Sequence, residues 1–516
     1  MRGLPLLLAV CCAVPVLAGD PAPATPQAVR AAVRRWRGQN EAALVRGLAD
    51  LLALPNVASD RATIGRNAER IQSLLEARGA RVRLLDGQGG PPVVYAELDA
   101  PGARRTVVVY AHYDGQPVDA REWTSPPFTP VLRAPAAGGA GQVIPLDALP
   151  PGPLDPEWRL YGRSASDDKG TIAAALFALD GLAAAGLTRT VRVKFFLEGE
   201  EEAGSPHLRA VLAANHALLE ADGWLLCDGP VHQTRRPQLY FGARGVTGLT
   251  LTAYGPLRPL HSGHYGNWAP NPALVLAHVV AGLRDVDGRI LVAGFYDDVR
   301  PPSAAERAAL AAVPPVDAAL REEYGLAATE AAGAALAERI MLPALNVRGL
   351  QAGGVGEHAA NAIPAEATAS IDFRLVPDQT PQGVRARVEA HLRAQGFTLL
   401  DHAPGAAERR TTPRLLRLQW EAGYPPARTP LDDPFARAVA ATLEEAGAPL
   451  VRVPTLGGSI PMYLFAEATG RPVVGLPIAN HDNNQHAADE NLRLQNLWDA
   501  IEAYAALFTG LGPKLD

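Results

Sequence analysis

The stretch Thr106-Val-Val-Val-Tyr-Ala-His-Tyr-Asp-Gly115 decides the fold class of this chain. Its first half, residues 106–110, is apolar without alternation, which is typical of a strand buried on both faces of a parallel sheet. Its second half carries His112 and Asp114 just past the end of that strand. Open α/β sheets bind their ligands at the carboxyl ends of their strands. The stretch therefore predicts both a buried sheet and a functional site at its edge.

Strands and helices alternate on both sides of this stretch. Because apolar strands and helices with three- and four-residue spacing follow one another, we expect an α/β domain with a mostly parallel mixed sheet flanked by helices. The predicted strands are 82–85, 93–98, 191–197 and 224–226, and the predicted helices are 28–54, 63–78 and 171–185.

The pattern of alternating apolar strands and helices ends near Gly245 and resumes near Pro434. Residues 246–253, 367–375 and 414–420 read as strands, and residues 270–283 and 381–395 as helices, with a helical stretch at 303–339 between them. We therefore predict a discontinuous α/β domain, residues 19–245 and 424–516, with an α+β domain, residues 246–423, inserted into it. Residues 134–156 contain few core residues and are predicted to form a long surface loop.

Composition narrows the class of protein. The chain has 516 residues, 48% of them hydrophobic and 20% charged, and a net charge of −6. These values argue against a disordered chain, and the absence of a basic run argues against a nucleic-acid partner.

The first residues resemble an export signal. Arg2, an apolar run and the small-residue site ending at Ala18 predict a signal peptide over residues 1–18, with a membrane anchor as the alternative. We expect an exported protein, periplasmic or secreted, with no membrane span in the mature chain. Cleavage would leave Cys227 as the one remaining cysteine, so no internal disulfide could form.

Five segments with metal-ligating side chains follow predicted strands or precede a helix. They contain His112, the pair Asp167-Asp168, the run Glu200-Glu201-Glu202, Asp228 and His486. Taken singly, such residues are usually helix caps, turns or solvated surface. Carboxylates that converge on one sheet edge repel one another unless cations neutralise them, so the set predicts a site for two divalent cations.

The motifs together resemble a family of di-zinc metallopeptidases. The family includes carnosinase-like dipeptidases, glutamate carboxypeptidase, aminoacylase and succinyl-diaminopimelate desuccinylase, and the chain looks most like the dipeptidase branch. The matching segments are AHYDGQP (111–117), LYGRSASDDKG (160–170), EGEEEAGS (198–205), LHSG (260–263), GFYDDVRP (294–301), NAIP (361–364), IDFRLVP (371–377) and GGSIP (457–461).

The resemblance implies five metal ligands. By motif position, His112 and Asp228 resemble the ligands of one metal, and Glu202 and His486 those of the other. Asp167 resembles the carboxylate that bridges the two. The implied cofactors are two zinc ions per subunit, with manganese as the alternative, since nitrogen and carboxylate ligands suit either.

The resemblance also implies three catalytic residues. Glu201 matches the general base that takes a proton from the metal-bridging water, and Asp114 matches the carboxylate that orients the His112 imidazole. His261 resembles the residue that stabilises the oxyanion and reaches across from the partner subunit in dimeric members. The resemblance implies that residues 19–245 and 424–516 form the catalytic domain and residues 246–423 a lid and dimerisation domain. A homodimer through the lid domain is therefore expected.

The substrate-binding residues follow from the same resemblance. Arg374 resembles the cation that grips the free carboxylate of the substrate, a task that suits a guanidinium. Gly458 and Ser459 resemble a loop that completes this carboxylate site, and Asn361 is expected to add a polar contact. The implied activity is hydrolysis of dipeptides or short peptides with a free C-terminal carboxylate. The alternatives are an N-acyl-amino-acid amidohydrolase and, more remotely, a metal-free binding protein on the same scaffold.

Overall fold

The computed structural model describes residues 24–135, 141–331, 333–447 and 449–516. The signal peptide predicted at residues 1–18 lies outside these ranges. Within them, no helix is both long enough and apolar enough to cross a membrane.

The larger part of the molecule is built on an eight-stranded mixed sheet. Its order is β1-β2-β7-β3-β8-β20-β9-β19. The four middle strands β7, β3, β8 and β20 run parallel, whereas β1, β2 and β9 join them by antiparallel pairing. The bounds are β1 (Arg81–Leu85), β2 (Val93–Leu98), β3 (Arg105–His112), β7 (Val191–Glu198), β8 (Gly223–Leu226), β9 (Gln238–Tyr240), β19 (Val451–Val453) and β20 (Val473–Gly475).

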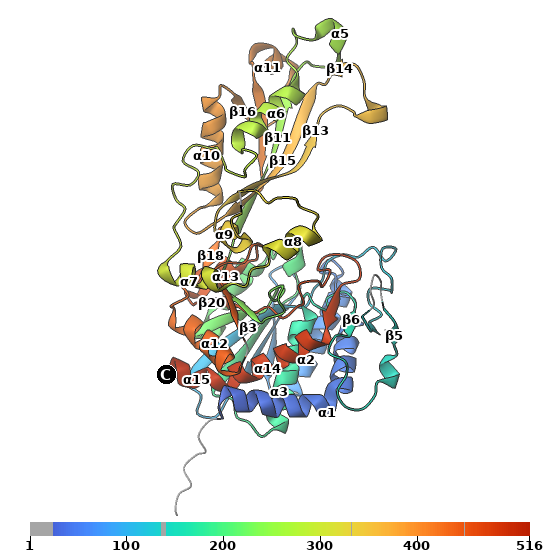
Figure 1. The fold of residues 1–516 in the computed structure, drawn as a ribbon, viewed down its shortest axis with the longest axis vertical. Helices are drawn as coiled ribbons and strands as arrows, with labels where there is room; N and C mark the ends of the chain where they lie inside the picture. The colour runs from blue at the N-terminus through green and yellow to red at the C-terminus, as the bar shows by residue number, and fades with distance from the viewer. Residues whose placement is uncertain (1–23, 136–140, 332, 448) are drawn as a thin grey trace, which may run out of the picture.

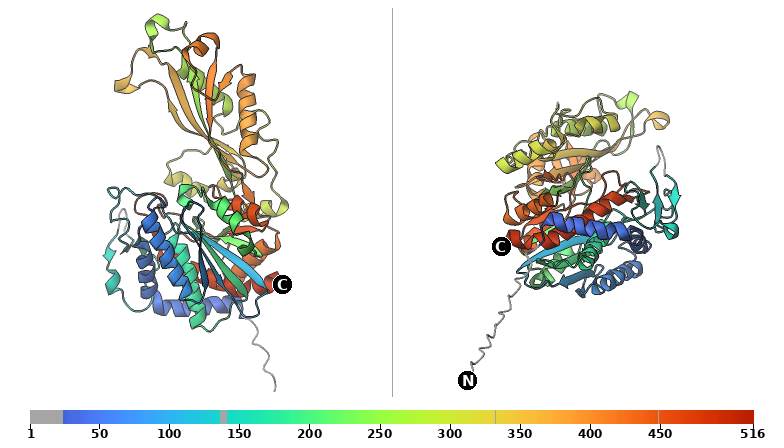
Figure 2. Two further views of the ribbon diagram at one scale, coloured as in Figure 1. Left: turned by 180° about the vertical axis from the view of Figure 1, so that it is seen from behind. Right: turned by 60° about the horizontal axis from the view of Figure 1, so that its bottom comes forward.

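Both faces of this sheet are covered, as the apolar run in β3 predicts. Val107 and Val109 belong to the core on one face, and Val108 and Tyr110 to the core on the other. The first face packs against α1 (Pro26–Leu52), α2 (Arg61–Glu76), α3 (Lys169–Ala184), α12 (Pro434–Glu445) and α14 (Leu494–Gly510), beside α15 (Gly512–Leu515). The second packs against α4 (Leu208–Ala214) and α13 (Met462–Thr469). Figure 2 shows these layers from two further directions.

A second, five-stranded sheet rises from this base and has its own core (Figure 1). Its order is β13-β15-β11-β17-β16, and α6 and α10 cover one side. The bounds are β11 (Gly245–Tyr254), β13 (Ala344–Gln351), β15 (Glu366–Leu375), β16 (Thr398–Leu400), β17 (Leu415–Trp420), α6 (Pro272–Leu283) and α10 (Pro381–Ala394). The α/β fold with an inserted α+β domain is thus confirmed.

Short elements connect and extend the two sheets. The predicted helical stretch at 303–339 consists of three short helices between the sheets, α7 (Ala304–Ala312), α8 (Asp317–Glu323) and α9 (Leu336–Ile340). Pro314 and Pro315 separate the first two, because proline disfavours helical backbone in the residue before it. Further short elements are β10 (Gly242–Ala243), β12 (Leu260–His261), β14 (Ala362–Ile363), β18 (Ala427–Arg428), α5 (Ser262–Tyr265) and α11 (Ala406–Thr411).

The prediction of a long surface loop at 134–156 was wrong in part; of this range, residues 136–140 lie outside the described residues. Residues Val143–Ile144 form β5, the edge of a four-stranded sheet of order β21-β6-β4-β5. Edge pairing uses backbone hydrogen bonds and needs few core side chains, so hydrophobic patterning does not reveal it. The other strands are β4 (Val131–Arg133), β6 (Arg159–Tyr161) and β21 (Asn491–Arg493).

Candidate metal centre and carboxylate site

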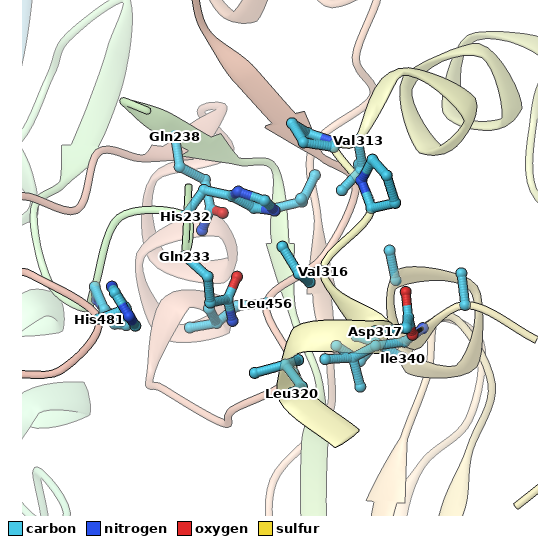
Figure 3. Close-up of a pocket in the computed structure, with 18 of the residues that line it drawn as sticks. His232, Gln233, Gln238, Val313, Val316, Asp317, Leu320, Ile340, Leu456 and His481 are labelled. Atoms are coloured by element: carbon cyan, nitrogen blue, oxygen red, sulfur yellow. Dashed lines mark hydrogen bonds between the residues drawn. The ribbon is translucent and has the colours of Figure 1, made fainter. Parts of the chain in front are cut away.

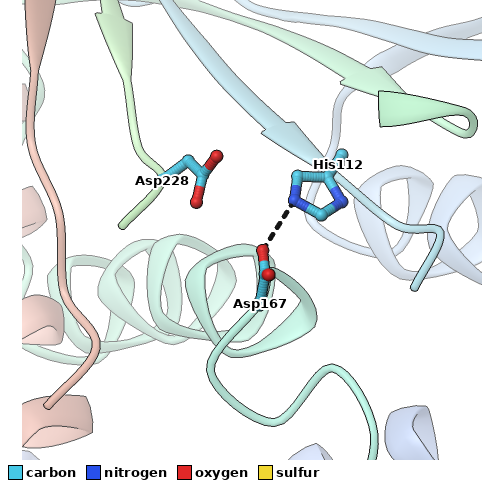
Figure 4. A group of neighbouring side chains, drawn as sticks. All are labelled: His112, Asp167 and Asp228. Atoms are coloured by element: carbon cyan, nitrogen blue, oxygen red, sulfur yellow. Dashed lines mark hydrogen bonds and ion pairs between the residues drawn. The ribbon is translucent and has the colours of Figure 1, made fainter. Parts of the chain in front are cut away.

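His112, Asp167 and Asp228 meet at the carboxyl edge of the large sheet (Figure 4). His112 ends β3, Asp228 lies just past β8, and Asp167 lies in the turn before α3. The Nε2 atom of His112 is 2.9 Å from Oδ1 of Asp167. One ligand atom from each residue lies within 4.8 Å of the others. All three side chains are buried, so their charges are poorly screened by water.

A second group shares Asp167 with the first. The Nε2 atom of His486 is 3.0 Å from Oδ2 of Asp167 and 3.1 Å from Oε2 of Glu202. Glu202 lies in the 3-10 turn Glu201–Ala203 that follows β7. The two oxygens of Asp167 therefore face different histidines, an arrangement that suits a bridging carboxylate.

Asp114 joins two of these segments. Its Oδ1 atom is 3.4 Å from Nδ1 of His112, and its backbone oxygen is 3.2 Å from the same nitrogen. Its two carboxylate oxygens also accept hydrogen bonds of 3.0 Å from the backbone N–H groups of Glu201 and Glu202. Asp114 thus fixes the position of the glutamate turn relative to the imidazole.

The electrostatics of the cluster fit a cation site. Burial raises the pKa of Glu201 well above its ordinary value, and it also raises the pKa of Asp228, with the charge of Asp167 adding to that second shift. The Oδ1 atom of Asp228 is buried without a hydrogen-bond partner among the described residues. An unpaired buried carboxylate oxygen is costly, and a divalent cation would satisfy it. The nitrogen and oxygen donors present are those that zinc or manganese binds.

Two glutamines that the sequence reasoning missed support the cluster. Gln485 donates a 2.8 Å hydrogen bond to Oδ2 of Asp167, and Gln116 donates one of 2.8 Å to Oε2 of Glu202. Gln485 directly precedes His486, and Gln116 lies two residues after Asp114. This proximity to predicted site residues was the sequence signal that could have identified both glutamines. Such outer contacts orient ligating carboxylates.

Glu490 is a third residue that the sequence reasoning missed. Its side chain is fully buried and accepts five hydrogen bonds of 2.8–2.9 Å. The donors are the Arg163 guanidinium, the backbone N–H groups of Ser164, Ser166 and Asp167, and the hydroxyl of Ser166. Nothing local in its sequence context indicates this role, because its partners lie more than 300 residues away.

Arg374 and Ser459 form a separate cationic site. Nη1 of Arg374, on β15, donates a 2.8 Å hydrogen bond to Oγ of Ser459. Arg244, which the sequence reasoning missed, donates from Nε to the Gly457 carbonyl at 2.9 Å and from its backbone N–H to the Gly458 carbonyl at 3.2 Å. Burial, with a smaller contribution from the nearby charge of Arg374, lowers the pKa of Arg244 to about 10. Two guanidinium groups beside one Gly-Ser loop suit an anionic ligand.

The structure brings His261 and Asn361 together, but far from the metal-ligating residues of the same chain. Both are exposed, on or beside the paired strands β12 and β14, and Ser262 N–H donates to the Asn361 carbonyl at 2.9 Å. Figure 1 shows β14 and α5 at the end of the second domain remote from β3. A single chain therefore does not bring these two residues to the cluster at the sheet edge.

The fold and the site together define a metallohydrolase. An α/β sheet presents two His-carboxylate groups that share one aspartate, and Arg374 of the inserted domain forms a cationic site together with Ser459 of the catalytic domain. The model of peptidase family M20/M25/M40 matches residues 145–509, which is more than half of the chain. The chain belongs to this family and is a metallopeptidase.

Individual relatives span nearly the same length. The chain is 25% identical to the mouse Beta-Ala-His dipeptidase, over 84% of this chain and 82% of the mouse protein. It is 26% identical to the Cys-Gly metallodipeptidase DUG1 of Saccharomyces cerevisiae, over 81% of each chain. An M20 family metallo-carboxypeptidase from Sulfolobus solfataricus has a similar structure, with a TM-score of 0.72 at 29% identity, covering 91% of this chain and 99% of that one.

Proposed function

We propose that this protein is a di-metal dipeptidase, which hydrolyses the peptide bond of dipeptides or short peptides with a free C-terminal carboxylate. The observation that carries the proposal is the pair of His-carboxylate groups that share Asp167. The two relatives named as dipeptidases, each aligned over more than four fifths of this chain, support the substrate class.

The metal-holding residues follow from the two groups. His112 and Asp228 would hold one ion, Glu202 and His486 the other, and Asp167 would bridge them. When bound, two such cations would lower the pKa of a water molecule and polarise the scissile carbonyl. Zinc is the proposed metal, with manganese as the alternative.

Glu201 is the proposed general base. It is adjacent in sequence to Glu202, and Asp114 fixes the backbone N–H groups of both residues. Burial raises its pKa in the metal-free chain, and two bound cations would oppose that shift and keep the carboxylate ionised. Glu201 could then take a proton from the attacking water and return it to the leaving amine. Asp114 acts through His112 and this turn and does not need to contact the substrate.

The Arg374 and Ser459 pair is the proposed binding site for the C-terminal carboxylate. The guanidinium and the hydroxyl already lie 2.8 Å apart, so both could donate to one anion. The Gly458 amide would complete the site, with Arg244 supporting the loop through the Gly457 and Gly458 carbonyls. Such a site explains a requirement for a free C-terminal carboxylate.

A homodimer would complete the active site. His261 and Asn361 lie beside each other at the end of the second domain that is remote from the cluster of their own chain. We assign them to the active site of a partner subunit, where His261 would stabilise the oxyanion and Asn361 would contact the substrate. Export to the periplasm or the medium is proposed from residues 1–18 and is checked by N-terminal sequencing of the mature protein.

One panel of substrates tests the proposed function. Metal-stripped protein is supplied with zinc or manganese and assayed with dipeptides, the same dipeptides amidated at the C-terminus, and N-acetyl amino acids. Hydrolysis of free dipeptides alone is expected. Turnover of N-acetyl amino acids without turnover of dipeptides would instead identify an amidohydrolase. A protein that binds no metal and hydrolyses nothing would be a binding protein.

A further inference from the structure

A cavity of about 380 Å³ lies where helices α7–α9 of the inserted domain meet the catalytic domain (Figure 3). A cavity of this size is within the range that proteins use for small ligands. One wall includes Val313 and Val316 from the segment between α7 and α8, Leu320 of α8 and Ile340 of α9. The opposite wall comes from loops of the catalytic domain, among them Leu456.

Each of these loops also carries a residue of the proposed active site. Pro230 and Val231 line the cavity, and one glycine separates them from Asp228 along the chain. His481 and Asp482 line it and begin the loop that carries His486. Two segments of the cavity lining are therefore continuous along the backbone with segments that carry proposed metal ligands.

The third loop joins the cavity to the proposed carboxylate site. Gly457 lines the cavity and precedes Gly458 and Ser459. Its carbonyl accepts the 2.9 Å hydrogen bond from Arg244. A Cβ atom on Gly457 would lie 3.1 Å from Cδ1 of Ile340, so the absence of a side chain lets the helical wall approach this loop closely. A residue of the cavity wall thus directly precedes the Gly458-Ser459 segment of the proposed carboxylate site and is hydrogen-bonded to Arg244 beside it.

The chemistry of the lining favours an uncharged ligand. Most lining side chains are apolar, and no lysine or arginine lines the cavity among the described residues. The Asp482 carboxylate is already paired with Arg159 and Arg493, and Asp317 accepts a 2.7 Å hydrogen bond from the Leu336 N–H. A ligand carboxylate would find no lysine or arginine partner in the described lining, and the carboxylate of Glu323 belongs to an exposed residue of α8.

We propose that this cavity is the subsite for the side chain of the substrate's C-terminal residue, and that it selects large, uncharged, apolar side chains. The inference rests on the proposed dipeptidase function. A carboxylate held by Arg374 and Ser459 places the side chain of the same residue next to Gly457, where the cavity begins. The inserted helices α7–α9 thereby determine which C-terminal residues the enzyme accepts.

The test compares three variants on four dipeptides, Ala-Gly, Ala-Leu, Ala-Phe and Leu-Gly. Val316→Trp fills the cavity, and Leu320→Ala enlarges it. Val286→Trp is the matched control, because Val286 is 91% exposed and does not line the cavity. In the wild type, kcat/KM for Ala-Leu and Ala-Phe should exceed that for Ala-Gly. Val316→Trp should reduce the ratio of kcat/KM for Ala-Leu or Ala-Phe to kcat/KM for Ala-Gly about 10- to 200-fold, which is the range for discrimination between apolar side chains. It should leave the turnover of Ala-Gly unchanged.

The remaining outcomes separate the two proposals. Leu320→Ala should shift the preference from Ala-Leu toward Ala-Phe, which keeps the test informative if the tryptophan variant fails to fold. If the kcat/KM ratios of Ala-Leu and Ala-Phe to Ala-Gly were the same in the wild type, Val316→Trp and Leu320→Ala, the proposed subsite would be wrong. The proposed dipeptidase function would still hold. Loss of Leu-Gly rather than Ala-Leu turnover would also overturn it, since the cavity would then bind the N-terminal residue. Failure of the wild type on all four dipeptides would overturn the proposed function itself.

Discussion

The buried carboxylate of Glu490 accepts a 2.9 Å hydrogen bond from the backbone N–H of Asp167. The same carboxylate also accepts hydrogen bonds from Ser164 and Ser166, so it fixes the whole turn that presents Asp167. Glu490 lies four residues after His486. One side chain therefore positions the shared aspartate relative to the segment that carries a histidine of the second group.

Replacement of Glu490 by glutamine should weaken this positioning. The amide nitrogen cannot accept the backbone hydrogen bonds, and the Arg163 charge loses its partner. We expect a loss of about 1–3 kcal/mol in the free energy of unfolding, measured by urea denaturation of the metal-free protein. We also expect zinc to be lost at lower chelator concentration. Glu157→Gln, at a partly exposed ion pair, is the matched control. Equal zinc retention in both variants would contradict a positioning role for Glu490.

Glu201→Gln should separate metal binding from catalysis. The proposed ligands remain, so two metal ions per chain should still bind, as measured by elemental analysis. Turnover of dipeptides should fall by about 10²- to 10⁴-fold, because no base accepts the proton of the attacking water. The neighbouring variant Glu202→Gln should instead lose metal. A Glu201→Gln protein with full metal content and near-normal turnover would refute the assignment of the base.

Removal of metal should abolish activity and lower thermal stability. The cluster contains several buried carboxylates, and burial raises the pKa of both Glu201 and Asp228 in the metal-free chain. A cation that binds only the folded state stabilises it by mass action, so Tm should rise with zinc concentration. Calorimetry with zinc, with manganese and with magnesium measures the effect. Undiminished activity after metal has been removed, as verified by elemental analysis, would exclude the metal-dependent mechanism.

Arg374→Ala should reduce kcat/KM for free dipeptides much more than kcat/KM for dipeptide amides. Loss of the guanidinium should cost about 2–5 kcal/mol of binding free energy for a carboxylate substrate, measured from kcat/KM. Slow turnover of the C-terminal amide should change much less, since the amide carries no negative charge. Arg348→Ala, on β13 of the same sheet, is the control. Equal losses on both substrates would mean that Arg374 does not contact the carboxylate.

His261→Ala and Glu201→Ala should complement each other when they are mixed. In a dimer that exchanges His261 between subunits, each variant alone is inactive, but a mixed dimer retains one intact site. An equimolar mixture that exchanges subunits should recover about one quarter of wild-type activity. Size-exclusion chromatography verifies the dimer. No recovery in a mixture shown to contain mixed dimers would place His261 outside the partner's active site.

Much of the site could be predicted from local sequence. The apolar run before His112 indicates a strand buried on both faces, and the carboxyl edge of such a strand is where α/β proteins bind ligands. His112 and Asp228 meet there because the parallel neighbours β3 and β8 end at one edge, and the turn before α3 adds Asp167. Alternating and helical periodicity also predicted the elements of the inserted domain. The breaks between helices in 303–339 and strand β5 were not predicted, because neither depends on hydrophobic patterning.

The remaining features depend on contacts between residues distant in the chain. Glu490 and Arg244 act through hydrogen bonds to segments more than 200 residues away, and local sequence contains no trace of such partners. The cavity forms only where α7–α9 meet three separate loops. The remote position of His261 follows from the extended β12–β14 end of the second domain. The sequence by itself determined the chemistry at the strand ends, through residue type and short-range periodicity. Tertiary packing alone decided what supports that chemistry and which side chains surround it.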